Sequence, residues 1–475
     1  MALLLLADIS NHQHRTQDEH DALLCAYALQ KRVLDVQRMS GSQTAIEQQK
    51  TRAGTIACQL ASLMKRLKMT DKIEFFYSEA IRLCPVHEEA LLALATMKLN
   101  TGAVIECQAH LTALLAASPK HVKAQLMLAD AKFKQNEQEG AIQYFKTLLQ
   151  ADATDFHALD KLVQCLKRSG QLGDVHRYIA ATQNACNSGK TMNHPGYHFI
   201  QGMVNLYERK VRDAIHHLNL ARTDPEWAQR SLCEMIGIYL NQEYQELFSI
   251  KISERIEAAG HLLTDLESRI AEGDDSGRFR LQVLRAYAIM AAKDTNKINQ
   301  IVPQLVEMIQ TDRDYIPAYL ALAHAFLELK EAPKARNQLK IIAGMTPGNA
   351  YADEFERSWL MLAEMYISSG SVDLAQKLAR KTLEHSRSSA KAWELLGEIM
   401  TMEGSFQDAA QYFENSWQCH RETSSSVGFK LAVSYQKANR HIDAIEVAHK
   451  ILNKNPDCRQ LKADVIDKCR SCLRV

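Results

Sequence analysis

A spacing of 34 residues recurs along the 475-residue chain and constrains its fold more than any other feature. Trp359 and Trp393 are separated by this interval, and so are Ala375 and Ala409. The same interval separates three further pairs: Pro85 and Pro119, Cys107 and Ala141, and Ala141 and Val175. A unit of fixed length buries its apolar face only against its neighbours, so the chain is expected to stack into an elongated helical array.

The segment that begins at Ile316 shows what each unit contains. Apolar residues fall on one face of two successive helices, which are joined by a turn near Lys330 and followed by Pro347. The residues expected to point inward are Tyr319, Leu322, Ala323, Phe326, Ala335, Leu339 and Ile342. Ala323 and Ala335 lie where the paired helices cross, since only short side chains allow so close an approach. This is the tetratricopeptide repeat (TPR) pattern.

About nine such units can be fitted, which predicts an all-α, right-handed superhelical solenoid of TPR helix-turn-helix repeats. An ordinary helical bundle is the alternative, but it does not predict a fixed period. Breaks in the period give the expected segments: an incomplete N-terminal repeat at 1–53, a TPR array at 54–194, a TPR-like pair with an extra helix at 195–248, an amphipathic helix and flexible connector at 249–278, a second TPR array at 279–458 and a capping helix at 459–475.

Charge and cysteine content narrow the possible partners. The 57 Lys and Arg nearly balance the 56 Asp and Glu, so no net field favours nucleic acid or an anionic membrane. The opening MALLLLADIS is too short to span a bilayer, and we expect no direct membrane insertion. The 11 cysteines include several at apolar helical positions, which suits a reducing compartment.

Ser188–Thr191 reads SGKT, the ending of a phosphate-binding loop. That motif needs a glycine where Asn184 stands and a strand before it, whereas the preceding segment has a helical pattern. These departures argue against nucleotide binding, but a nucleotide-dependent enzyme centred on Lys190 remains the rival hypothesis. Loss of a measured ATPase activity in the Lys190→Ala variant would support that rival. We expect no enzyme and no cofactor.

Two other motifs suggest metal binding. Cys469 and Cys472 form a C-x-x-C without two further ligands, which favours ordinary reduced thiols over zinc. His216 and His217 are neighbours on a helix and so point about 100° apart, which prevents ready chelation of one metal. We therefore predict no metal site.

The remaining candidate is a partner-binding groove along the inner wall of the solenoid. The first-helix residues expected beside the core stripe are Leu92, Met97, Met127, Leu320, Leu360, Met361, Met365 and Phe429. Such a wall is apolar and rich in methionine, which suits an amphipathic helix or an extended apolar segment of a partner. Alternatively, neighbouring turns of a tight superhelix fill their own groove.

Several stretches resemble the intraflagellar transport protein 139 family, also called the tetratricopeptide repeat protein 21 family. The resemblance begins near Thr51 and is densest in ARNQLKIIA at 335–343, DEFERSWLMLAEMYI at 353–367 and the segment that begins at Val427. The non-repeat stretch EWAQRSLCEMIGIYLN at 226–241 also matches. Family members are more than twice as long, so the chain is a fragment, a truncated gene product or a shortened subunit.

The resemblance implies a non-catalytic subunit of intraflagellar transport complex A, active in retrograde ciliary transport and in ciliary entry of membrane proteins. It implies WD40-plus-helical-repeat subunits of that complex as partners, and dynein and membrane-protein cargo as indirect ones. The implied location is the cilium or flagellum, the basal body and the cytoplasm. A TPR scaffold of a ubiquitin ligase or chaperone system is the alternative.

Overall fold

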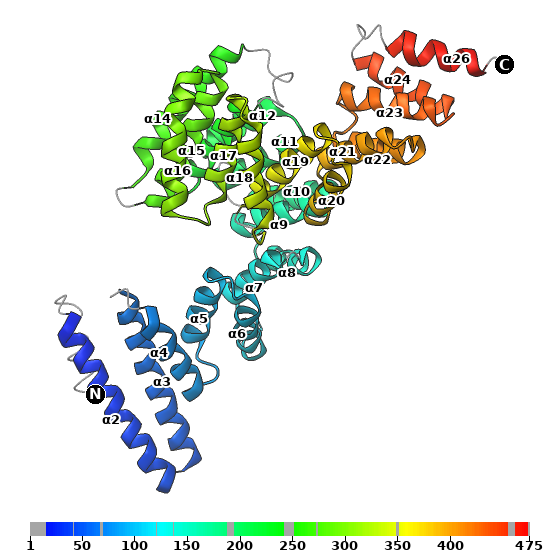
Figure 1. Ribbon diagram of the computed structural model, residues 1–475. Helices are drawn as coiled ribbons and strands as arrows, with labels where there is room; N and C mark the ends of the chain where they lie inside the picture. The colour runs from blue at the N-terminus through cyan, green and yellow to red at the C-terminus, as the bar shows by residue number, and fades with distance from the viewer. Residues whose placement is uncertain are drawn as a thin grey trace. The chain divides into compact units, whose positions relative to one another are not determined.

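The computed structural model describes residues 16–40, 42–66, 70–119, 121–135, 137–187, 194–241, 251–271, 274–347, 351–454 and 461–473. Within these ranges every regular element is helical, which confirms the expected all-α class (Figure 1). The chain divides into two compact units, residues 1–151 and residues 152–475. This division falls inside the segment 54–194, which the sequence period treats as one array.

Unit 1, residues 1–151, is built from antiparallel helix pairs. Its helices are α2 (Thr16–Ser40), α3 (Gln43–Arg66), α4 (Thr70–Leu83), α5 (Glu88–Asn100), α6 (Val104–Ala117), α7 (Val122–Lys134) and α8 (Gln138–Ala151). Helix α3 pairs with α4, α5 with α6 and α7 with α8, while the long helix α2 packs along α3. Leu60, Leu63 and Met64 of α3 are fully buried in the core that these helices share.

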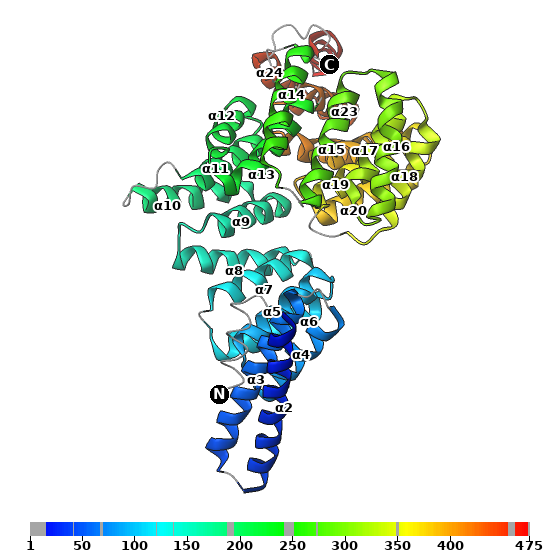
Figure 2. The ribbon, with the colours of Figure 1, turned by 90° about the vertical axis from the view of Figure 1, so that its left-hand side faces the viewer.

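Unit 2, residues 152–475, continues the same arrangement through more repeats. Its elements are α9 (Phe156–Ser169), η1 (Leu172–Asp174), α10 (Val175–Asn187), α11 (Pro195–Tyr207), α12 (Val211–Ala221), α13 (Pro225–Leu240), α14 (Ile252–Arg269), α15 (Asp275–Ala291), α16 (Thr295–Thr311), α17 (Ile316–Glu328), α18 (Ala332–Gly344), α19 (Ala352–Ser368), α20 (Val372–His385), α21 (Ala390–Met402), α22 (Phe406–Cys419), α23 (Ser425–Lys437), α24 (His441–Lys454), η4 (Lys462–Asp467) and α26 (Lys468–Leu473). Odd-numbered helices from α9 to α21 neighbour one another in space, as Figure 2 shows for α9, α11 and α13.

Small residues occupy the crossings of paired helices, as expected. Ala323 and Ala335 are both fully buried where α17 crosses α18. A Cβ atom on Gly397 of α21 would lie 2.7 Å from the ring of Phe413 on α22, which is closer than van der Waals contact allows. These positions fix the separation of the two backbones in each repeat.

The turns within repeats share one backbone conformation. Gly370 and Gly404 have φ angles of 78° and 80°, and Lys330 and Asn439 adopt the same left-handed region with φ near 61°. Glycine enters this region without the steric cost that a Cβ brings. The turn predicted near Lys330 therefore lies where the chain reverses direction between α17 and α18.

The C-terminal segment covers the last repeat. Leu461, Val465 and Ile466 are at most 1% exposed and belong to the core cluster that includes α23 and α24. Asp464 and Lys468 lie on the exposed side and form an ion pair of 3.1 Å. The described residues of this segment therefore present an apolar face to the last repeat and a charged face to solvent. Among the described residues, no helix is both long and apolar enough to cross a membrane.

Candidate interaction surface

The first helices of successive repeats in unit 2 direct polar side chains toward one another. We call this group the inner polar cluster; its members are Lys167, Tyr207, Glu234, Arg280, Tyr287, His324, Asp353, Glu354, Glu356 and Arg357. Tyr207 of α11 interacts electrostatically with Lys167 of α9 and Asp353 of α19. Arg357 of α19 interacts in the same way with Tyr287 of α15. Helices far apart in sequence thus share one electrostatic environment.

An ion pair joins the two ends of this cluster. The Lys167 Nζ atom lies 3.4 Å from Asp353 Oδ1 and 4.6 Å from the centre of the Tyr207 ring. The positive charge of Lys167 is the main reason that the pKa of Asp353 falls to about 2. Burial lowers the pKa of Lys167, but the charges of Asp353, Tyr207 and Glu356 together outweigh burial and raise it. Both side chains are therefore held in their charged forms.

The middle of the cluster favours neutral groups. Burial, followed by the charge of Arg357, lowers the pKa of His324 to about 4, and the His324 ring meets Tyr287 edge-on at 5.6 Å. Burial also raises the pKa of Glu354 and of Glu356, and the nearby Asp353 charge adds to this effect. His324 is consequently neutral at physiological pH.

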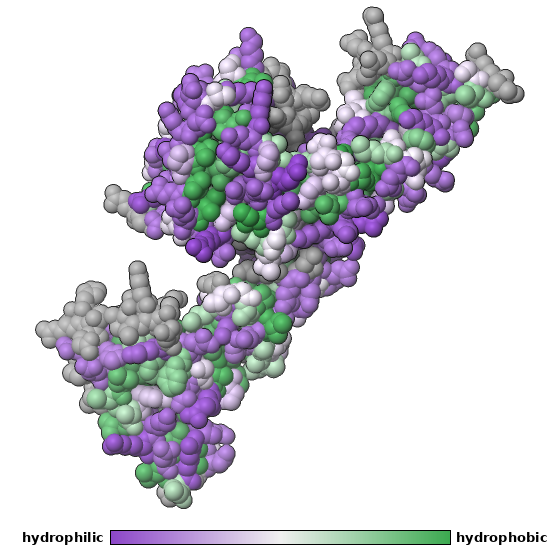
Figure 3. All heavy atoms as spheres, viewed as in Figure 1, coloured by the Kyte–Doolittle hydropathy of each residue, from purple (hydrophilic) through white to green (hydrophobic). Residues whose placement is uncertain are grey.

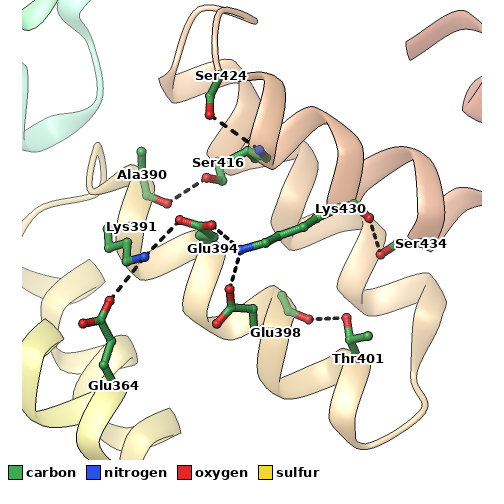
Figure 4. A network of polar contacts seen from close by, with 12 residues as sticks. Glu364, Ala390, Lys391, Glu394, Glu398, Thr401, Ser416, Ser424, Lys430 and Ser434 are labelled. Carbon is green, nitrogen blue, oxygen red and sulfur yellow. Dashed lines mark hydrogen bonds and ion pairs between the residues drawn. The ribbon is translucent and has the colours of Figure 1, made fainter. Parts of the chain in front are cut away.

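A second set of charges links three consecutive repeats, and we call it the charge ladder: Glu364, Lys391, Glu394, Lys430 and Glu398. Lys391 of α21 lies 3.2 Å from Glu364 of α19 and 3.4 Å from Glu394 (Figure 4). Lys430 of α23 bridges Glu394 and Glu398 of α21 at 2.6 Å and 2.5 Å. Glu364 and Lys391 remain 47% and 41% exposed. The ladder thus aligns neighbouring repeats and still presents charge to solvent.

Glu394 is the central position of the ladder, because it is 7% exposed and pairs with two lysines. Burial raises its pKa, but the bonds to Lys430 and Lys391 outweigh burial and lower it. We expect Glu394→Gln to reduce the free energy of unfolding by about 1–2 kcal/mol, because two partly buried ammonium groups lose their counter-charge. Urea denaturation at pH 7 measures this loss.

The matched control is Glu364→Gln, which removes a half-exposed carboxylate from the same ladder. Its cost should stay below about 0.5 kcal/mol, since an exposed pair is well screened by water. Equal losses for the two variants would contradict a central role for Glu394.

The eight residues predicted to line an apolar groove are divided between the two units. Leu92, Met97 and Met127 lie in unit 1, where each is half-buried against a core cluster. In unit 2, Leu360 and Phe429 pack half-buried against the core of the last repeats. Much of the apolar surface of these five side chains is therefore buried inside the protein.

The other three groove residues come together between α17 and α19. Met361 and Met365 are half-buried against the core cluster that contains Leu320. The prediction that Leu320 lines an accessible wall is wrong, because this side chain is 1% exposed. Helix α17 packs against α15, α16, α18 and α19, so it buries side chains on several faces. Substitution of Met361 or Met365 by glutamate would therefore disturb the core as well as the surface.

The motifs considered for chemistry fall as follows. Ser188–Thr191 lies outside the described residues, although the segment before it is the helix α10. Cys469 is buried and Cys472 exposed on α26, and both are free thiols. His217 lies 3.2 Å from His198, measured between Nδ1 atoms, and its ring meets that of His216 edge-on at 5.5 Å. In the part of the chain that the structure describes, no three His, Cys, Asp or Glu side chains could hold a metal ion.

Sequence reasoning missed both polar groups because it followed the apolar stripe of each first helix. The missed signal is a second stripe on the same helices. Asp353, Arg357 and Glu364 are spaced by four and seven residues on α19, and Lys391, Glu394 and Glu398 by three and four on α21. Such spacings place charges on one face of a helix.

Comparisons with known proteins identify the chain's relatives. Residues 258–470 match the model of the tetratricopeptide repeat protein 21 C-terminal ARM domain, and residues 122–240 match that of the fifth ARM repeats domain of the same family. Tetratricopeptide repeat protein 21A of Mus musculus is 31% identical over 99% of this chain, and protein 21B of Homo sapiens is 32% identical over 99%. The chain spans 36% and 37% of those two relatives, about a third of their length.

Solved helical-repeat structures also resemble the chain. The crystal structure of the APC/C hetero-tetramer Cut9-Hcn1 covers 98% of this chain and 88% of its own chain with a TM-score of 0.43 and 14% identity. The yeast Tom70 structure covers 88% and 90% with a TM-score of 0.39 and 14% identity. Family models, sequence identity along nearly the whole length and the observed repeats agree. The chain belongs to the tetratricopeptide repeat protein 21 family.

Proposed function

We propose that the protein is a non-catalytic structural subunit or adaptor of intraflagellar transport complex A, acting in retrograde ciliary transport and in ciliary entry of membrane proteins. Its partners are the WD40-plus-helical-repeat subunits of that complex, and through them dynein and membrane-protein cargo. It works in the cilium or flagellum, at the basal body and in the cytoplasm.

One observation carries this proposal: identity to tetratricopeptide repeat protein 21 relatives extends along 99% of the chain. The match includes α13, whose sequence departs from the repeat consensus, as well as the other helices of residues 122–240. A function that depended only on a generic repeat would not require this segment.

The surface chemistry supports binding of other proteins. Polar side chains predominate on the face of unit 2 seen in Figure 3, and the charge ladder adds half-exposed Glu364 and Lys391 to its first helices. Half-exposed ion pairs can exchange partners with charges on another protein at small net cost. Binding through this surface should therefore weaken as salt rises.

Affinity purification of the tagged full chain from ciliated cells tests the proposal. We expect other complex A subunits to be recovered, together with a fraction of dynein. A variant with Glu364→Lys and Glu398→Lys should lose these subunits, because the ladder would then present only positive charge.

The matched control reverses an exposed charge away from the ladder. Lys334→Glu, in an ion pair that leaves Lys334 61% exposed on α18, should retain the complex A subunits. Recovery of chaperones or ubiquitin ligase components without any complex A subunit would overturn the proposal.

A further inference from the structure

Unit 2 makes contacts between repeats that are far apart in sequence. Lys167 and Asp353, which form the 3.4 Å ion pair, are separated by 186 residues. Beside them, the backbone N–H of Arg387 donates a hydrogen bond of 2.8 Å to the carbonyl oxygen of Arg168. A Cβ atom placed on Gly170 would lie 3.8 Å from the Cβ of Arg387, which is ordinary van der Waals contact. The end of α9 thus touches both α19 and the turn between α20 and α21.

A second long-range contact joins the next repeats along the chain, from the end of α11 to the turn before α23. The Glu208 carboxylate, after α11, is 1% exposed and pairs with Arg421 at 2.8 Å in the turn before α23. His176 and Lys210 also contact this carboxylate at 2.5 Å and 2.8 Å. Arg421 has a φ angle of 49°, a conformation that costs a residue with a side chain energy unless its contacts hold it.

These contacts differ in kind from those between successive repeats. Successive repeats share apolar core, as Leu320, Trp359 and Leu362 do between α17 and α19. The closing contacts named above are ion pairs and one backbone hydrogen bond. The Lys167–Asp353 pair is partly exposed and contributes little on its own, whereas Glu208 is a buried carboxylate and makes its pair with Arg421 the stronger of the two. Closure thus depends on a few polar contacts.

We propose that the Lys167–Asp353 and Glu208–Arg421 contacts are an electrostatic latch that closes unit 2 into one turn. When the latch opens, α9 and α11 separate from α19 and the turns after α20 and α22 while every repeat stays folded. Opening separates Lys167 from Asp353 and Arg421 from Glu208 and leaves these charges available to a partner. The latch follows from contacts within unit 2 and does not depend on the proposed ciliary role.

Hydrogen exchange of the full chain, followed by mass spectrometry, tests the latch because the backbone N–H of Arg387 bonds to the Arg168 carbonyl oxygen beside the Lys167–Asp353 pair. In the Lys167→Glu variant, exchange in the peptide 385–389 should rise about tenfold at low salt. Peptides from 316–344, far along the chain from the closure, should keep their protection. The milder Lys167→Gln should show a smaller rise at the same peptide.

A variant with both charges of the Lys167–Asp353 pair reversed distinguishes loss of the latch from general damage to the fold. The variant Lys167→Glu with Asp353→Lys restores an attractive pair and should recover most of the protection at 385–389. The surface control Lys334→Glu should exchange like the wild type. In the wild type, 0.5 M NaCl should mimic Lys167→Gln, since salt screens ion pairs over a few ångströms. Unchanged exchange at 385–389 in both single variants, or a double variant with no recovery, would overturn the latch.

Discussion

Replacement of Trp359 by alanine should lower the free energy of unfolding of unit 2 by about 3–5 kcal/mol. Trp359 is fully buried between α19 and its neighbours, where it packs with Phe355 at 5.7 Å between ring centres. Lys381 lies 4.5 Å above the ring and His385 meets it edge-on at 5.7 Å. The variant loses the burial of a large apolar surface and leaves a cavity that surrounding helices refill only in part. Urea denaturation followed by circular dichroism measures the loss.

Trp393 provides a matched control, because it occupies the same repeat position 34 residues later. Its side chain is only half-buried: the ring stacks on Tyr412 at 5.9 Å and its Nε1 donates to the Arg387 carbonyl oxygen at 3.0 Å. Trp393→Ala should therefore cost about 1–2 kcal/mol. Similar losses for the two tryptophans would show that repeat position, rather than burial, decides the cost.

Acidification from pH 7 to pH 4 should destabilise unit 2 through two histidines. Burial is the main cause that lowers the pKa of His324 and of His420 to about 4, and the charges of Arg357 and Arg209, respectively, add to it. In the unfolded chain each histidine binds a proton near pH 6.5, so between pH 6.5 and 4 the unfolded state holds more protons. Stability is complete above pH 6.5, falls through this window by on the order of 2 kcal/mol for each histidine, and levels off below pH 4.

The window distinguishes these histidines from Asp353. A carboxylate whose folded pKa lies near 2 contributes stability above its unfolded pKa near 4 and loses it only as pH falls toward 2. In the double variant His324→Gln with His420→Gln, the urea midpoint should depend less on pH between pH 6.5 and 4. The decline of the midpoint below pH 4 should be unaffected. A slope that persists unchanged in the double variant would assign the pH dependence to other groups.

Local sequence could predict the repeats because each one is specified within about 34 residues. Ala323, Ala335, Leu339 and Ile342 are fully buried as predicted, since the 3.6-residue helical period alone decides which of them face the paired helix. Tyr319 and Leu320 show the limit of this reasoning. Both are buried, because α17 is enclosed by neighbours on several sides and a single stripe does not describe it.

The closure of unit 2 could not be predicted in the same way. It depends on small rotations between successive repeats, which add up over the 186 residues between Lys167 and Asp353. No local sequence pattern shows how large the summed rotation between the repeats is. The charges themselves were visible in the sequence, but a charged residue on a helix is usually solvated, so nothing local marked Glu208 as a buried carboxylate.

The close approach of Gly397 to Phe413 helps to set the angle at which α21 crosses α22. The angle between α21 and α22 therefore affects the orientation of every later helix of unit 2, including the terminal cap. A methyl group at this position requires the Phe413 ring or the helix itself to move, and a change in the crossing angle displaces the later helices by an amount that grows with their distance from the crossing. The curvature of the array is thus sensitive to one atom in its C-terminal part.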